Sequence, residues 1–478
     1  MMPKCFKILS PCGILGYGFP DSSFEAGLAD RPDAIVVDAG STDAGPHKLG
    51  AKTAIVSRIA AKKDLVRLID GGIRLNIPVI IGSAGGSGGK SHVEWTLSII
   101  REIFLERKFP ELKTAVIWAD IPDAEILKRL QAGQVTPLGA TVPDLTEATL
   151  SQTTGVVAQM GVEPILAALN EGAQLVVCGR AYDPSPFAAV GIHAGFDAAL
   201  SYHLGKVLEC GALCCDPGTT KDCMMGVLYD DCFEVYPCDP KRKCSELSVA
   251  AHTFYEKDHP YILHGPGIVM DLSGCTFRQV AENRVRVTGS RMKATDPYEI
   301  KLEGARKVAY RTFVIAGVRD PLLIEKIEEV ENLVETSVRE QYKEIPSGSY
   351  RVNFFNYGKN GVMGMLEPSR QVPHELCVLF EVLADTQQLA STICASIRST
   401  FMHYGYDGRK STAGNLAFPY APSDVEFGPV FEFSVYHLMP VDDPRTLFPI
   451  EWWSPLNGFL PRTAENAGIT RNAGTGEA

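Results

Sequence analysis

Short apolar runs alternate with longer amphipathic stretches through the first half of the chain. The apolar runs are residues 34–38, 77–82, 115–120 and 174–179. Because each run is continuously apolar, it is typical of a strand that is buried on both faces of a parallel sheet. Apolar residues at helical spacing occur between or beside the runs, at residues 64–75, 92–107 and 163–170. This alternation predicts an α/β domain built on a doubly wound, mostly parallel sheet.

The pattern changes in the second half of the chain. Residues 225–320 contain short alternating stretches and predict a β-rich insertion in the first domain. A charged amphipathic helix is predicted over residues 321–343. Strand, strand, helix and strand patterns follow, and they predict a smaller α+β domain of the ferredoxin-like type. The predicted domains are therefore residues 1–320 and 345–445, followed by a tail over residues 446–478.

Length, charge and cysteine count narrow the functional classes. The chain has 478 residues, which is long for one compact core, and its net charge is −11. A negative charge disfavours nonspecific binding to nucleic acid or to an anionic membrane, since both need a basic face. The sequence contains no apolar run near the ~20 residues of a membrane span and no secretory leader pattern. The 13 cysteines are an odd number, so we expect reduced thiols in a cytoplasmic protein.

Loops rich in glycine, hydroxyl and carboxylate groups follow three of the predicted strands. They are D-A-G-S-T-D-A-G-P at 38–46, G-S-A-G-G-S-G-G at 82–89 and G-R-A-Y-D-P-S at 179–185. Ligands of open α/β sheets bind beyond the carboxyl ends of the strands, where such loops converge. The sequence therefore predicts a cleft that binds an anion.

Acid/base and binding roles follow from the residue types in these loops. The candidate catalytic residues are Asp38, Asp43 and Glu209. The candidate substrate- or anion-binding residues are Ser41, Thr42, Gly82, Ser83, Gly85, Gly86, Arg180 and Asp183. Each has a structural alternative: the aspartates cap helices or hold turns, Arg180 pairs internally with Asp183, and Glu209 is solvated or paired.

A zinc site in the cysteine-rich stretch is possible, but it is not what we expect. Seven cysteines lie between Cys210 and Cys244, yet this stretch contains neither a C-x-x-C pair nor a histidine. The sequence also lacks an H-E-x-x-H motif, a G-x-S-x-G elbow and a Rossmann G-x-G-x-x-G at the first strand. We therefore expect no metal and no cofactor.

One motif favours a different class of protein. Residues 84–91, A-G-G-S-G-G-K-S, fit a relaxed phosphate-loop pattern in which Lys90 is the Walker lysine. Asp120, at the end of a later apolar run, fits the Walker-B carboxylate. Glycine-rich turns produce this short pattern by chance, so a nucleotide hydrolase remains the disfavoured alternative.

Longer motifs resemble the acyclic terpene utilisation (AtuA) family. In the first ~320 residues they are V-V-D-A-G-S-T-D-A-G-P, I-P-V-I-I-G-S-A-G-G-S-G-G, M-G-V-E-P-I-L-A-A-L-N-E-G-A-Q-L-V-V-C-G-R-A-Y-D, L-E-C-G-A, K-L-E-G-A and A-G-V-R-D-P. Further on, H-E-L-C-V-L-F-E-V-L-A-D-T-Q and G-N-L-A-F-P-Y-A-P-S-D resemble the domain that is often attached to that family. The family's glycine loop does not generally continue into Gly-Lys-Ser, so the resemblance implies that Lys90 is a local variation.

The resemblance also has implications for the ligand. The family is associated with breakdown of branched terpenoid acids through acyl-CoA intermediates, which implies small carboxylates or CoA thioesters. This chain departs from the family after L-E-C-G-A, where it continues L-C-C-D-P-G-T-T-K-D-C. If that stretch lines the pocket, the substrate differs from that of the relatives.

Together these observations lead to a hypothesis with two alternatives. The leading hypothesis is a lyase or hydratase that acts on a small carboxylate or an acyl-CoA thioester by carboxylate acid/base chemistry. The first alternative is a noncatalytic subunit or ligand carrier in an acyl-CoA-processing assembly, and the second is the nucleotide hydrolase. For partners we expect the small-molecule ligand, no nucleic acid, no membrane, and a homo-oligomer.

Overall fold

The computed structural model describes residues 4–42, 44–255, 259–346, 348–369, 371–410 and 413–461. It divides into two compact units: residues 1–306 with 433–478 form unit 1, and residues 307–432 form unit 2. Strands β15 (Glu299–Val318) and β18 (Asp424–Pro440) each run from one unit into the other. Helices and mixed sheets are both present, which confirms the predicted α/β class. The unit bounds differ from the predicted domains 1–320 and 345–445.

Five parallel strands form the centre of the sheet in unit 1. Their order is β1-β2-β3-β7-β4, and every neighbouring pair among them is parallel. Their bounds are Phe6–Ser10 (β1), Ala34–Asp38 (β2), Val79–Gly82 (β3), Leu175–Cys178 (β7) and Thr114–Ile117 (β4). The four apolar runs of the sequence are β2, β3, β4 and β7, which confirms that part of the prediction.

Antiparallel strands extend both edges of this sheet, so the whole sheet is mixed rather than mostly parallel. On one edge lie β8 (Met224–Leu228), β9 (Cys232–Pro237), β13 (Arg284–Thr288) and β12 (Thr276–Ala281). On the other lie β19 (Ile450–Ser454) and β20 (Gly458–Phe459). The predicted β-rich insertion therefore supplies edge strands of the main sheet. Part of the predicted tail does the same, because β19 pairs with β4.

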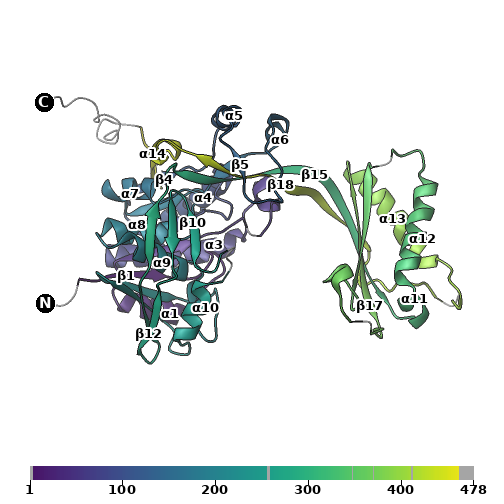
Figure 1. Ribbon diagram of the computed structural model, residues 1–478, viewed down its shortest axis with the longest axis horizontal. Helices are drawn as coiled ribbons and strands as arrows, with labels where there is room; N and C mark the ends of the chain where they lie inside the picture. The colour runs from purple at the N-terminus through teal and green to yellow at the C-terminus, as the bar shows by residue number, and fades with distance from the viewer. Residues whose placement is uncertain are drawn as a thin grey trace. The chain divides into compact units, whose positions relative to one another are not determined.

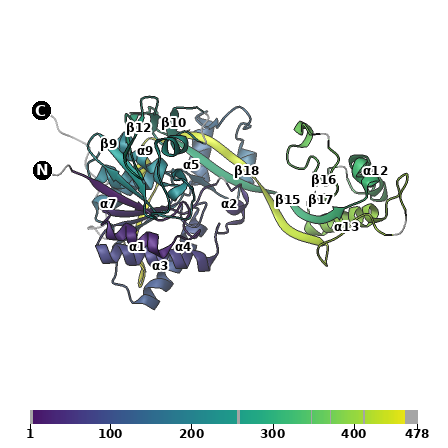
Figure 2. The ribbon, with the colours of Figure 1, turned by 90° about the horizontal axis from the view of Figure 1, so that it is seen from below.

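Helices cover both faces of the sheet, because alternate residues of each strand point to opposite faces. Ile35 and Val37 belong to a core that contains side chains of α1 (Asp21–Ala29), α3 (Arg58–Leu75) and α4 (Lys90–Arg107). Ala34 and Val36 belong to a second core with α7 (Glu163–Asn170), α8 (Ser185–His193) and α9 (Ala198–Leu208). Figure 2 shows α1, α3 and α4 side by side along one face. Because helices cover both faces of the sheet, the loops meet at the ends of the strands.

The remaining elements of unit 1 are short. They are α2 (His47–Ala51), α5 (Asp123–Gln131), β5 (Thr136–Pro137), α6 (Glu147–Ser151), β6 (Val156–Ala158), η1 (Gly211–Cys214), α10 (Glu246–Thr253), β10 (Ile262–Gly265), β11 (Ile268–Asp271), β14 (Arg291–Ala294) and α14 (Pro444–Leu447). Strands β10, β11 and β14 form a separate three-stranded sheet. Of the described helices in either unit, none is long and apolar enough to cross a membrane.

Unit 2 places helices on one face of a sheet, as Figure 1 shows. After β15 come α11 (Pro321–Glu325), α12 (Ile327–Gln341), β16 (Tyr350–Tyr357), η2 (Gly364–Leu366), β17 (Leu376–Ala384), α13 (Gln387–His403) and β18. The main elements follow the order β-α-β-β-α-β, and the strands lie in the order β16-β17-β15-β18. This order of elements along the chain is that of the split βαβ motif. It agrees with the ferredoxin-like type, which stays a prediction.

Candidate functional site

Asp38 is a buried carboxyl at the carboxyl end of β2. Asp38 is 5% exposed, and its Oδ1 has no hydrogen-bond partner within the described chain. Gly82 is its neighbour in the register of β3, and a Cβ at Gly82 would lie 3.4 Å from this oxygen. Burial raises the pKa of Asp38 well above its ordinary range; Asp183 and Glu209 raise it further, and Arg180 opposes them. A carboxyl in this state holds a proton that a water-exposed aspartate would lose.

The predicted residues Asp183 and Glu209 are therefore close enough to Asp38 for their charges to change its pKa. Lys206 lies beside them. Glu209 directly follows α9, and its Oε1 lies 2.6 Å from the Nζ of Lys206. Burial alone would lower the pKa of Lys206, but the charge of Glu209 raises it overall. The side chain of Asp183 is 27% exposed, in the loop after β7. Asp38, Asp183, Glu209 and Lys206 are called the carboxylate cluster below.

Two further side chains line the cluster and were not predicted. The Sγ of Cys210 lies 3.1 Å from the hydroxyl of Tyr255, and Lys206 Nζ lies 5.2 Å from the Tyr255 ring centroid. Burial, followed by the charge of Glu209, raises the pKa of Cys210 to about 12. Cys210 is therefore a neutral thiol rather than a preformed thiolate nucleophile. The adjacency of Lys206, Glu209 and Cys210 in K-V-L-E-C was a sequence signal for this group; Tyr255 had none.

Arg180 is held by internal partners. It is 1% exposed; its Nε lies 2.8 Å from Glu303 Oε2, and its Nη1 lies 2.8 Å from Asp183 Oδ1 and 2.9 Å from Ala181 O. Burial would raise the pKa of Glu303, but the charges of Arg180 and Lys301 lower it to about 2. This geometry matches the internal-pair alternative rather than the predicted carboxylate clamp. Arg180 positions Asp183 instead of presenting its fork to a ligand.

The glycine loop after β3 is buried and packs against the neighbouring loops. A Cβ on Gly40 would lie 2.3 Å from the Cα of Gly86, and a Cβ on Gly88 would lie 2.2 Å from Arg180 N. The hydroxyl of Ser83 accepts from the Arg180 guanidinium at 3.2 Å. Gly85 has a φ of 71°, in the left-handed region. Close approach of backbones therefore accounts for these glycines, and at Gly82 the loop lies against Asp38.

The phosphate-loop resemblance is not supported by the geometry. Lys90 begins α4, its side chain is 66% exposed, and its Nζ lies 4.0 Å from Glu94 Oε1. Burial raises the pKa of Asp120, while a hydrogen bond from the backbone N–H of Lys90 lowers it in part. A carboxylate of the protein thus already lies at the helix N-terminus, where a phosphate would bind. Lys90 contributes to the surface of α4.

The loop after Asp38 carries the last predicted residues. Thr42 is 2% exposed, and its carbonyl accepts from Gly45 N at 2.9 Å. Ser41 is half-buried beside it. Asp43 lies outside the described residues. The backbone of Thr42 therefore closes a turn, and the binding role of its side chain stays a prediction.

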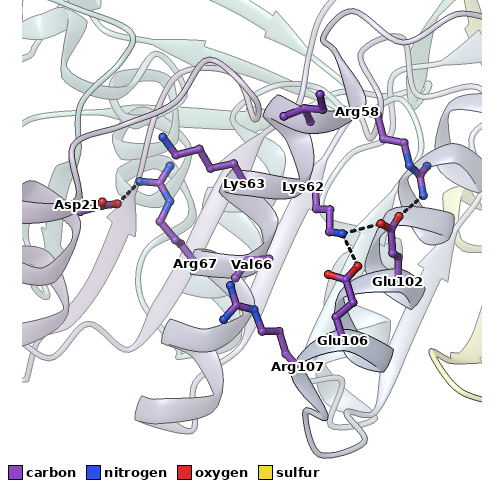
Figure 3. Close-up of a pocket in the computed structure, with 10 residues that line it drawn as sticks. Asp21, Arg58, Lys62, Lys63, Val66, Arg67, Glu102, Glu106 and Arg107 are labelled. Carbon is purple, nitrogen blue, oxygen red and sulfur yellow. Dashed lines mark hydrogen bonds and ion pairs between the residues drawn. The ribbon is translucent and has the colours of Figure 1, made fainter.

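A separate surface pocket lies over α3 and α4, and Figure 3 shows its lining. Lys62 contacts Glu102 and Glu106, at 2.5 and 2.8 Å. Arg67 contacts Asp21 at 2.6 Å. These acidic partners balance much of the basic charge, and no member of the carboxylate cluster lines this pocket. We therefore place the candidate site at the carboxylate cluster.

Comparison with known proteins identifies the family. A model described as "Acyclic terpene utilisation family protein AtuA" matches residues 70–225 and 239–422. A search of the curated proteins finds no match. The matched ranges begin after Asp38 and include the 82–89 loop, Arg180, Asp183 and Glu209. Since they cover more than half of the 478 residues, the chain belongs to the acyclic terpene utilisation (AtuA) family.

Proposed function

We propose that the chain is an enzyme of the lyase or hydratase type that acts on a small carboxylic acid or an acyl-CoA thioester. The observation that carries the proposal is Asp38, a buried carboxyl with a raised pKa and a free Oδ1 among the described residues. Addition or removal of water, or cleavage next to a carbonyl, requires a group that transfers a proton at that position. A carboxyl with a raised pKa suits this role near neutral pH.

The cluster assigns different tasks to its members. Asp38 transfers the proton. Lys206, kept cationic by Glu209, offers a donor to the carboxylate or enolate oxygen that develops during the reaction. Arg180 is balanced by Glu303 and fixes Asp183, so it acts as a positioning residue.

Charge explains how an anionic substrate enters a region rich in carboxylates. Asp38 and Asp183 influence each other electrostatically, and a proton on Asp38 removes one negative charge from the cluster. An anion is then opposed by fewer like charges, while Lys206 attracts it. Protonation of Asp38 and binding of the substrate anion are therefore expected to favour each other.

Asp38→Asn tests the proposal. The amide cannot transfer the proton, so turnover should fall by about 10²–10⁴-fold. Stability at neutral pH should rise rather than fall, because the amide removes a carboxyl that keeps its proton in the folded state and loses it in the unfolded chain. Candidate acyl-CoA thioesters and small carboxylic acids are first screened by thermal shift, and turnover of those that bind is then measured for both proteins.

A matched control and two contrary outcomes complete this test. Asp33→Asn changes an aspartate directly before β2, at the opposite end of that strand from Asp38 and outside the carboxylate cluster; its Oδ2 accepts from Lys7 N. The turnover of this variant should equal that of the unmodified protein. Full turnover by Asp38→Asn would show that Asp38 does not transfer the proton. A stable complex with a second protein and no turnover of any bound ligand would favour the carrier alternative; light scattering detects such a complex and also tests the proposed homo-oligomer.

A further inference from the structure

Three buried cysteines meet directly after the segment that carries Glu209. Cys214 ends η1, Cys215 follows it, and Cys244 lies two residues before α10. Their sulfur atoms all lie within 4.8 Å of one another, and those of Cys215 and Cys244 are 3.5 Å apart. Their exposed fractions are 1, 6 and 1%, respectively. Across the described chain, this is the group of potential metal-ligating side chains compact enough to share one ion.

The backbone fixes this convergence. Asp216 N donates to Lys243 O at 2.8 Å, and Lys243 N donates to Asp216 O at 3.1 Å. This pair lies one residue beyond Cys215 on one segment and one residue before Cys244 on the other. The capping box of Ser245 and Ser248 then starts α10 immediately after Cys244. The three sulfurs are therefore presented by two tied segments rather than by loose loops.

The spacing of the sulfurs suits a single bound ion. A metal–sulfur bond of about 2.3 Å places sulfurs that share an ion about 3.8–4.0 Å apart. The observed separations are 3.5 Å for one pair and no more than 4.8 Å for the others, so the three sulfurs are close enough together to share one ion. Met224 adds a fourth sulfur, since its Sδ lies 3.3 Å from Cys215 Sγ. Thiolate and thioether ligands select soft, thiophilic ions.

We propose that Cys214, Cys215 and Cys244 form a binding site for a thiophilic divalent cation of the zinc type. Three thiolates carry three negative charges; a divalent ion reduces the net charge to one, whereas a monovalent ion leaves two. Because uncompensated buried charge is costly, the divalent ion is favoured. The ion would fix η1, and with it the position of Glu209 at the end of α9. It would be a structural ion held among buried side chains.

Cobalt and zinc titrations of the reduced full-length chain test this site. Co²⁺ is the spectroscopic probe: we expect one ion per chain, thiolate-to-cobalt charge-transfer absorption, displacement by Zn²⁺, and a higher melting temperature with either ion. Changing a residue that only supports a metal ligand typically lowers metal affinity by about 10–100-fold. Cys215→Ser removes a ligand itself, so the Zn²⁺ affinity of this variant should fall by about 100-fold or more. Cys238→Ser is the matched control from the same segment, and Cys377→Ser controls for an exposed thiol; both should retain the absorption.

A second measurement uses the unmodified protein. Zn²⁺ should protect Cys214, Cys215 and Cys244 from alkylation, mapped by mass spectrometry, while Cys377 stays reactive. This protection tests the site even if Cys215→Ser fails to fold. Absorption that survives in Cys215→Ser, absence of protection, or a Cys215–Cys244 disulfide in the protein purified without reductant would each overturn the proposal.

Discussion

Two buried carboxyls, Asp38 in unit 1 and Glu331 in unit 2, have much in common and differ in their surroundings. Burial is the largest cause that raises the pKa of each, and it brings that of Glu331 to about 8. Each has an oxygen without a hydrogen-bond partner among the described residues. Yet Asp38 lies at a strand end with Asp183, Glu209 and Lys206, whereas Glu331 lies on α12 and accepts from Asn356 Nδ2 at 3.1 Å. A raised pKa alone is therefore weak evidence of a site.

The architecture explains the difference. Loops from several strands meet at one edge of an open sheet, so ionisable side chains from distant segments are brought together there. The interface between α12 and the sheet of unit 2 is filled with apolar side chains such as Val330, Val334 and Phe380. The charged groups that influence Glu331 in that interface are Glu328 and Lys359, which pair with each other. Convergence of different groups, rather than burial of one, distinguishes the candidate site.

Arg180→Met should produce the largest loss of stability and would sharpen this comparison. The change leaves Glu303, which is fully buried, without its main counter-charge. Removing one member of a buried pair typically costs about 3–5 kcal/mol of unfolding free energy, measurable by urea denaturation. The control is Arg311→Met in unit 2, which removes a partner of Glu381 that is 28% exposed; Glu381 keeps a hydrogen bond from Asn353, so the cost should be smaller, about 1–2 kcal/mol. Equal losses in the two variants would contradict the assignment of Arg180 as an internal counter-ion.

Glu331→Gln should stabilise unit 2, but only at higher pH. The folded state holds the proton up to a pKa of about 8, whereas the unfolded state loses it near the ordinary pKa of 4.5. The unmodified protein therefore loses stability as the pH rises from about 4.5 to about 8. The neutral variant avoids this loss, so above pH 8 its advantage should reach about 2–4 kcal/mol, and it should vanish below pH 4.

Hydrogen exchange of the α12 amides in the full chain measures this difference against pH. Glu328→Gln is the matched control, because Glu328 lies one turn away on the same helix and pairs with Lys359 near the surface. That variant should show a change of less than about 1 kcal/mol at any pH. A constant advantage of Glu331→Gln from pH 4 to pH 9 would mean that ionisation of Glu331 is not the cause.

The sequence predicted the centre of the sheet because the physical signal there is local. The strands β2, β3, β4 and β7 are buried on both faces, so each is apolar throughout. The strand β19, which lies between β4 and β20, lacked such a signal. It pairs with β4 after a large separation along the chain, and its burial of Trp452 and Trp453 depends on that pairing.

The candidate site could be predicted in part for the same reason. Asp38 and Asp183 follow apolar strands, so their place at the strand ends was readable from the sequence. The role of Arg180 was not, because Glu303, its main partner, lies 123 residues further on. The glycines of the 82–89 loop were ambiguous, since close packing of backbones and phosphate binding both require residues without a Cβ.

Lys90→Ala should produce the smallest effect and would test whether the glycine loop differs from a nucleotide site. Lys90 is two-thirds exposed and only 4.0 Å from Glu94, so its removal should change the unfolding free energy by less than about 0.5 kcal/mol. Asp120→Ala is the informative control: it removes the carboxylate that accepts from the Lys90 backbone N–H and should cost about 1 kcal/mol. A true Walker lysine contacts the β- and γ-phosphates, so its loss would abolish nucleotide hydrolysis. We expect no magnesium-dependent ATP hydrolysis by the unmodified protein; hydrolysis that disappears in Lys90→Ala would make this loop, rather than the carboxylate cluster, the catalytic region.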